Sequence, residues 1–121
     1  MTTPTDILRE AKILLNGDVL TEVRRSTTIG RCYYAAFNHV KGHYSAKSFP
    51  REEGESVHAA LIRHLVRSDN TNIRYAGKKL RGLFRARIKA DYHLENPVDR
   101  GEETVAYEDA AEIMNEILGE A

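Results

Sequence analysis

Apolar residues recur every three or four positions through most of this chain, a spacing that predicts amphipathic α-helices. No stretch alternates apolar and polar residues in the manner of a half-buried β-strand. Thr3 as N-cap and Pro4 at the first helical position begin the first helix, and Asn16-Gly17 ends it. Asp18 is the expected cap of a second, longer helix.

A loop over residues 45–55 separates the second helix from a third. Ser56 caps this third helix, and the polar residues 68–70 end it. A fourth helix starts at about Thr71 and ends before Asn96-Pro97. The second and fourth helices carry the longest stripes of apolar residues on one face.

A last helix follows a loop over residues 95–104, with Thr104 as its expected cap. Five helices predict an all-α fold, an antiparallel up-and-down bundle in a single domain over residues 1–121. The predicted inward positions are Ile7, Leu8, Ala11, Leu14 and Leu15; Leu20, Val23, Gly30, Tyr33, Tyr34, Phe37, Val40 and Tyr44; Val57, Leu61, Ile62, Leu65 and Val66; Ile73, Ala76, Gly77, Leu80, Leu83, Phe84 and Ile88; and Ala110, Ile113, Met114, Ile117 and Leu118.

Composition narrows the setting in which the protein acts. Hydrophobic residues make up 41% and charged residues 30% of the chain, as in an ordinary globular domain. No apolar run approaches the ~18 residues that cross a bilayer, and the N-terminus lacks the basic and apolar regions of a signal peptide. We therefore expect a cytoplasmic protein without a membrane partner. The single cysteine, Cys32, lies in an apolar pattern and is expected to pack in the core.

The net charge of zero hides an uneven distribution. Residues 1–94 carry 17 Lys and Arg against 9 Asp and Glu, whereas residues 95–121 carry 1 against 9. The body is thus +8 and the C-terminal segment −8. A nucleic-acid partner remains compatible with this distribution, although the overall charge alone argues against one.

Arg87 is a charged residue on the inward stripe of the fourth helix, which makes it the most informative position. Asp91 follows at i+4, so the two side chains can form an ion pair on their own helix. Alternatively, Arg87 can act with His93, although six helical positions place the two on different faces. Arginine offers a fork of donors to a phosphate and histidine exchanges protons near neutrality, a combination suited to metal-independent RNA cleavage.

The fourth helix is strongly basic, with seven Lys and Arg and no acid between residues 74 and 89. This face can follow a phosphate backbone, for which Arg81, Arg85 and Lys89 are the expected RNA-binding residues. Alternatively, it can lie against the acidic C-terminal helix. Both hold if the acidic helix covers only part of the basic stripe.

The other histidines carry less weight. His39 and His43 have the i, i+4 spacing of a metal pair, but no third ligand stands nearby in the sequence. His58 lies on the apolar stripe of the third helix and is expected to be a hydrogen-bonded core residue. We expect no metal site and no cofactor.

Two segments resemble the HEPN domain family, and the likeness extends over nearly the whole chain in helix order and length. Arg25, Tyr33-Tyr34-Ala35 and Phe37 are similar to the second-helix signature of small prokaryotic HEPN proteins. The segment from Arg87 through Ala90-Asp91-Tyr92 to His93 resembles the family's later Arg, Ala-Asp-Tyr segment. It overlaps the Arg-x(4–6)-His motif, with five intervening residues.

The resemblance implies a homodimer whose two Arg/His pairs meet in a cleft. Many HEPN proteins are metal-independent ribonucleases that serve as toxins or antiviral effectors. A nucleotidyltransferase-type antitoxin often accompanies them and can adenylylate a tyrosine near the motif. By position, Arg87 would bind the phosphate, His93 would be the general acid or base, and Tyr92 would be the candidate for modification.

The resemblance also implies an alternative. Active members typically carry a polar residue after the motif arginine, where this chain has Ile88. Many relatives keep the arginine and Ala-Asp-Tyr without a usable histidine. In that case the protein would be a non-catalytic module that binds a nucleotide or a partner, with Arg87 held in a structural ion pair by Asp91.

Overall fold

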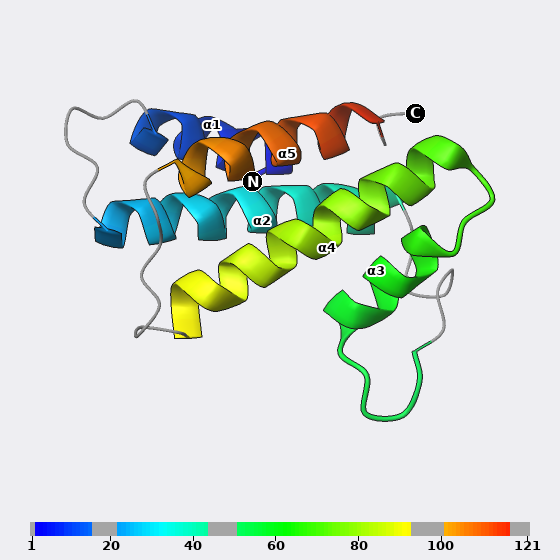
Figure 1. Cartoon of the computed structure of the whole chain (residues 1–121). Helices are drawn as coiled ribbons and strands as arrows, with labels where there is room; N and C mark the ends of the chain where they lie inside the picture. The colour runs from blue at the N-terminus through cyan, green and yellow to red at the C-terminus, as the bar shows by residue number, and fades with distance from the viewer. Residues whose placement is uncertain (1, 16–21, 44–50, 93–100, 117–121) are drawn as a thin grey trace.

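The computed structural model describes residues 2–15, 22–43, 51–92 and 101–116. Within these ranges the chain forms five helices and no strand. The helices are α1 (Pro4–Leu15), α2 (Glu22–His43), α3 (Val57–Val66), α4 (Thr71–Tyr92) and α5 (Glu102–Glu116). Figure 1 shows α2 running opposite to α1 and α4, and α5 running opposite to α4. The predicted all-α antiparallel bundle is confirmed.

The start signals predicted for α1 and α3 act as caps. The Asp6 N–H donates to Thr3 Oγ1 at 3.1 Å, and the Thr3 N–H donates to the Asp6 carboxylate at 3.1 Å. This reciprocal pair of bonds satisfies two backbone donors that a helix end leaves open. Ser56 Oγ likewise accepts from the Ala59 N–H at 3.1 Å at the start of α3.

The prediction that Thr104 caps the last helix is wrong, because α5 begins two residues earlier at Glu102. Gly101 adopts a φ of 102°, which favours glycine, and its N–H donates to Glu103 Oε1 at 3.1 Å. The Thr104 N–H already donates to the Gly101 carbonyl at 3.1 Å. Thr104 is therefore inside the first turn, and the carboxylate of Glu103 serves the helix end instead.

The buried side chains of all five helices form one continuous core. On α2 the buried positions include Ile29, Tyr33 and Phe37, spaced four residues apart. Val23 and Tyr34 were predicted to face inward, but they are 74% and 52% exposed. Tyr34 lies ~100° around the helix from Tyr33, beyond the edge of the buried arc. The inward prediction is therefore wrong for these two residues.

Several predicted positions lie outside the described residues, so the structure does not address them. They are Asn16, Gly17, Asp18, Leu20, Tyr44, His93, Asn96, Pro97, Ile117 and Leu118.

The basic helix α4 packs against α2, α3 and α5. Its predicted inward residues Leu80 and Leu83 are fully buried, and Phe84 is half-buried against the core. Gly77 lies against α3 so closely that an added Cβ would stand 2.7 Å from Leu65 Cβ. The fold thus places one side of α4 on α3 and the other on α5.

Candidate functional site

Arg87 forms the ion pair that the spacing predicted. Its Nε donates to Asp91 Oδ2 at 3.1 Å, and this is its only hydrogen bond to any described residue. Its guanidinium carbon lies 5.9 Å from the ring centroid of Tyr33 on α2, within the range of a cation–π contact. The side chain is 30% exposed. Asp91 and Tyr33 therefore hold Arg87 by one edge and one face, while Nη1 and Nη2 bond to no described residue.

An aromatic cluster lies beneath Arg87 and joins three helices. His58 of α3 shares a 2.7 Å hydrogen bond between its Nδ1 and the Tyr33 hydroxyl. Its ring packs against Phe37 at 4.3 Å and is stacked on Phe84 at 5.5 Å, both between centroids. The predicted hydrogen bond of His58 is confirmed, but its side chain is half-buried and is not among the buried residues of the core.

The surroundings of His58 favour its neutral form. Burial lowers its pKa below the ordinary value of 6.5, and the positive charges of Arg87 and Lys41 lower it further. Burial likewise raises the pKa of the Tyr33 hydroxyl, an effect that the Arg87 charge opposes. The Tyr33 side chain therefore lies between the two groups: its hydroxyl is hydrogen-bonded to His58, and its ring lies under the Arg87 guanidinium.

The partner that the sequence proposed for Arg87 lies outside the described residues. α4 ends at Tyr92, whose side chain is also outside the described part, and His93 follows. The pairing of Arg87 with His93 and the modification of Tyr92 both stay predictions.

The acidic helix α5 covers one side of the basic stripe of α4. Lys79 Nζ lies 3.2 Å from Asp109 Oδ1 and 3.6 Å from Glu112 Oε1. Lys89 Nζ lies 3.1 Å from Glu102 Oε2. A hydrogen bond and the charge of Asp109 raise the pKa of Lys79. Two lysines of the stripe are therefore paired by α5, and Lys89 is one of the three expected RNA-binding residues.

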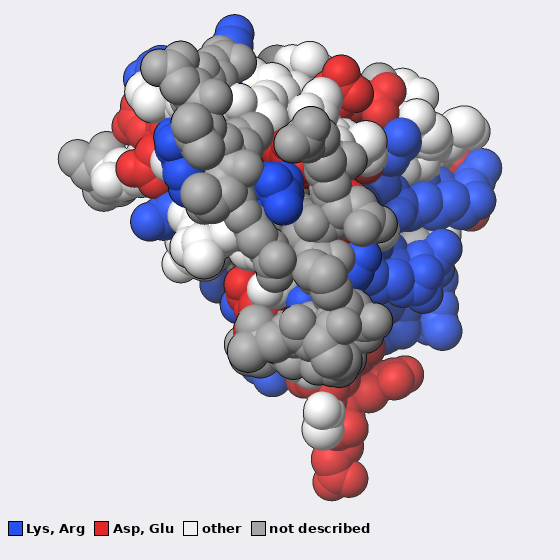
Figure 2. Space-filling view, turned by 60° about the vertical axis from the view of Figure 1, so that its left-hand side comes forward, with Lys and Arg blue, Asp and Glu red and all other residues white. Residues whose placement is uncertain are grey.

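Three other residues of the basic stripe have no carboxylate partner among the described residues. Lys78 and Arg85 are exposed and Arg81 is half-buried, and none of the three forms an ion pair with a described residue. Figure 2 shows Lys and Arg side chains gathered along one side of the molecule. The two alternatives for the stripe thus hold for different residues: α5 pairs Lys79 and Lys89, while Lys78 and Arg85 are exposed to solvent.

A groove between α3 and α4 lies beside these arginines. It has a volume of about 360 Å³, and its apolar surface comes from Ala59, Ile62, Val66 and Phe84. Arg81 of α4 lines it together with Arg63 and Arg67 of α3. We call this hollow, with these seven lining residues, the α3/α4 groove.

The contribution of α3 to this surface was not predicted from the sequence. Arg63 and Arg67 are spaced i, i+4, so they share one face of their helix. Ile62 and Val66 have the same spacing one position earlier. An arginine face beside an apolar stripe was therefore visible in the sequence, but its meeting with Arg81 depends on how α3 packs on α4.

Metal-binding groups are sparse in the described structure. Among the described residues no three His, Cys, Asp or Glu side chains gather into a metal site. His39 and His43 lie with ring centroids 5.1 Å apart. Cys32 is fully buried, and burial raises its pKa to about 12, as expected of a packed thiol. No helix in the described ranges is both long and apolar enough to cross a membrane.

The protein is thus an all-helical bundle in which Arg87, a partly exposed residue of the basic helix α4, lies over the Tyr33 ring of α2. A family model of the HEPN domain matches residues 6–120, and the chain therefore belongs to the HEPN domain family. No curated protein and no solved structure matches the chain significantly. The family assignment confirms the resemblance drawn from the sequence.

Proposed function

We propose that this protein is a metal-independent endoribonuclease of the HEPN type. A base removes the proton of a ribose 2′-hydroxyl, and the 2′-oxygen attacks the adjacent phosphorus. The bond from phosphorus to the 5′-oxygen breaks, and that oxygen takes up a proton. The products are a 2′,3′-cyclic phosphate and a 5′-hydroxyl, and no oxidant, metal or cofactor enters this balance.

The observation that carries the proposal is the way in which two neighbouring side chains hold Arg87. Asp91 binds Nε and the Tyr33 ring lies under the guanidinium, so the side chain loses little further freedom when it binds an anion. Nη1 and Nη2 have no bond to a described residue and can donate to two oxygens of a phosphate. In this role Arg87 stabilises the negative charge that builds on the phosphorus oxygens during attack.

The remaining parts of the proposal are supported by the resemblance of the chain to active HEPN proteins. His93 is the proton-transfer residue, and two protomers bring their Arg87/His93 pairs together in a homodimer. The protein is the toxin of a toxin–antitoxin or antiviral defence system in the cytoplasm. Its antitoxin is of the nucleotidyltransferase type and silences it by modifying Tyr92.

A second candidate function is a non-catalytic module that binds a nucleotide or a partner. The observation that favours it is the Arg87–Asp91 pair itself, because a carboxylate 3.1 Å from Nε satisfies part of the guanidinium without any ligand. In this role Arg87 fixes the end of α4 and does not touch a reacting phosphate.

Cleavage of RNA in EDTA distinguishes the two functions. The wild type is expected to cut single-stranded RNA and leave 2′,3′-cyclic phosphate ends. Arg87→Ala is expected to lower the cleavage rate about 100- to 1,000-fold, as loss of one charge-stabilising donor does. His93→Ala is expected to lower it as well.

The matched control is Arg9→Ala. Arg9 is an exposed arginine paired with Asp6 on its own helix, as Arg87 is with Asp91. Its removal should leave the rate unchanged. Circular dichroism and unfolding curves verify that each variant folds. No cleavage by the wild type, or cleavage that survives both Arg87→Ala and His93→Ala, would contradict the enzyme and favour the binding module.

A further inference from the structure

The α3/α4 groove combines an apolar floor with arginine side chains. Ile62 and Phe84 contribute to the floor, and the volume of about 360 Å³ is at the lower end of the range for small-molecule sites. An apolar hollow of this kind accepts a flat, weakly polar group. The arginines that line it favour a group that also carries negative charge.

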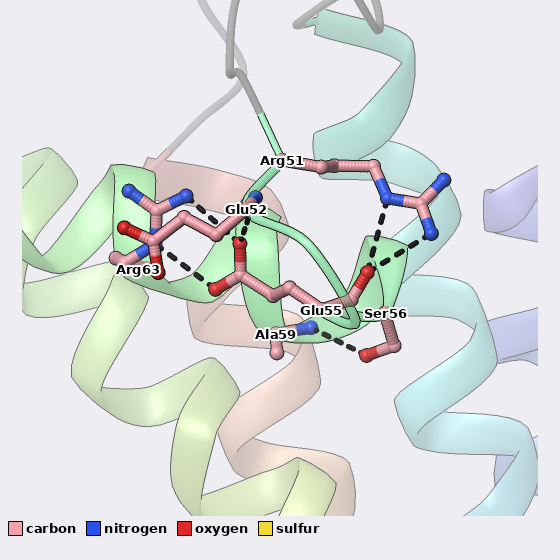
Figure 3. Close-up of polar contacts among 6 residues, drawn as sticks. All are labelled: Arg51, Glu52, Glu55, Ser56, Ala59 and Arg63. Atoms are coloured by element: carbon pink, nitrogen blue, oxygen red, sulfur yellow. Dashed lines mark hydrogen bonds and ion pairs between the residues drawn. The ribbon is translucent and has the colours of Figure 1, made fainter.

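The three arginines do not contribute equally. Arg63 donates from Nε and Nη2 to the two carboxylate oxygens of Glu55, at 3.0 and 2.9 Å, as Figure 3 shows. Glu55 also accepts the N–H of Glu52 at 3.0 Å, so the loop before α3 holds this pair in place. The Arg63 charge is largely offset by Glu55. Arg67 and Arg81 therefore supply the net positive charge of the groove.

Phe84 belongs both to the lining of the α3/α4 groove and to the aromatic cluster under Arg87. Phe84, on its floor, precedes Arg87 by three residues on α4, a rise of ~4.5 Å along one face of the helix. The Phe84 ring packs 5.3 Å from Tyr33, and the Arg87 guanidinium lies over that same tyrosine. Phe84 thus connects the floor of the groove, through Tyr33, to the guanidinium of Arg87.

We propose that the α3/α4 groove binds one unpaired nucleotide of an RNA strand, with its base against Phe84 and its phosphate on Arg67 and Arg81. The assignment rests on the proposed function, and it adds a subsite that selects single-stranded RNA. A base inside a duplex is stacked and cannot enter a hollow between two helices, whereas an unpaired base can turn into it.

Binding of a non-cleavable RNA tests the groove separately from catalysis. The probe is a fluorescent single-stranded 2′-O-methyl oligonucleotide, which lacks the attacking hydroxyl, and the readout is fluorescence anisotropy. Ala59→Leu fills the groove without changing charge, and Arg81→Met removes one charge while keeping much of the side-chain volume. Each is expected to weaken binding about tenfold, because stacking on apolar surface and one phosphate contact are lost. Phe84 is left in place because it packs on the core.

The controls separate the groove from general attraction to positive charge. Arg9→Met changes the net charge equally on α1, which does not pack on α3, and should bind as the wild type does. The same oligonucleotide in a duplex should bind at least tenfold more weakly than the single strand. Equal binding of single strand and duplex, or unchanged binding by Ala59→Leu, would overturn the proposal and leave only backbone attraction.

The outcome for the groove does not depend on the outcome for catalysis. A wild type that binds the probe through the groove but does not cut cleavable RNA refutes the proposed function and keeps the subsite. A wild type that cuts RNA while Ala59→Leu and Arg81→Met bind and cut equally well refutes the subsite and keeps the enzyme.

Discussion

The two sides of α4 carry basic residues in different chemical situations. On the side of α5 the cations are lysines, and Lys79 and Lys89 are each within 3.2 Å of a carboxylate of that helix. On the side of α3 the cations are arginines, and Arg81 has no ion pair with a described residue. Each side also has a groove, of about 520 Å³ towards α5 and about 360 Å³ towards α3.

The difference shows that the sequence of a helix does not by itself determine which of its charges stay available to a ligand, because neighbouring helices pair some of them. The groove towards α5 is lined by Glu102 and Asp109, which are paired with Lys89 and Lys79, and no Lys or Arg among its lining residues offers a contact to a phosphate. The groove towards α3 receives Arg63 and Arg67 in addition to Arg81, and Glu55 forms an ion pair with Arg63. An RNA strand is therefore expected on the α3 side of α4 and excluded from the α5 side.

The largest effect is expected from Leu80→Ala, which loosens both sides of α4 together. Leu80 is fully buried in the core that α4 shares with its neighbours. Its truncation should lower the free energy of unfolding by about 2–5 kcal/mol, measured in urea. A loss below about 1 kcal/mol would mean that this face of α4 does not pack as described.

Gly77→Ala breaks the α3 side alone. The new Cβ would stand 2.7 Å from Leu65 Cβ and 2.9 Å from the Val66 backbone nitrogen, so α3 must move away from α4. We expect a loss of about 1–3 kcal/mol in the free energy of unfolding, as for overpacking. Any RNA affinity that depends on the α3/α4 groove should fall as well.

Gly82→Ala is the matched control for this substitution. Gly82 is on the same helix and lines the groove towards α5, and an added Cβ there meets no atom within 4 Å. The change should raise the free energy of unfolding by about 0.5–1 kcal/mol, because alanine favours the helix. Equal losses in the two variants would contradict the close approach of α3 to Gly77.

The sequence predicted the individual helices and the contacts within them better than the packing between helices. Five helices and the caps at Thr3 and Ser56 follow from local patterns, since each depends on residues within a turn or two. The Arg87–Asp91 pair also follows, because both partners lie on one helix. Tyr34 was misplaced because two adjacent tyrosines cannot both point to the centre of one stripe.

Contacts between helices were harder to predict from the sequence. The opposing alternatives for the basic stripe depended on which residues α5 covers, and that follows from the packing angle of two helices rather than from either sequence. The α3/α4 groove similarly needs Arg67 and Arg81, fourteen positions apart, to be brought together by the turn between their helices. Spacing along a chain does not contain this information.

The acid stability of the α3 side depends on Glu55. Hydrogen bonds from Arg63, together with the Glu52 N–H, hold the pKa of Glu55 at about 2, against an ordinary value of 4.5. Because the folded pKa is the lower one, ionised Glu55 stabilises the fold above about pH 4.5, and this contribution is lost as the pH falls towards about 2. Glu55→Gln should therefore be less stable than the wild type at pH 7.

Urea unfolding midpoints measured from pH 7 to pH 2 check this prediction. The difference between wild type and Glu55→Gln should shrink through the interval from about pH 4.5 to about pH 2 and be smallest at its lower end. Glu53→Gln, an exposed neighbour in the same loop, serves as the control for general charge effects. A difference that stays constant down to pH 2 would show that Glu55 does not stabilise the fold through its ionised form.

The smallest effect is expected on the α5 side, from the double substitution Lys79→Met with Asp109→Asn. The pair is 3.2 Å apart and partly exposed, so its removal should change the free energy of unfolding by less than about 1 kcal/mol. The net charge is unchanged, and Met keeps the aliphatic stem of Lys79 against the helix. RNA affinity should stay within about twofold of the wild type, whereas Arg81→Met on the opposite side lowers it about tenfold. An equal loss in the two variants would mean that RNA contacts both sides of α4, because a strand confined to the α3 side has no contact with a lysine that α5 already pairs.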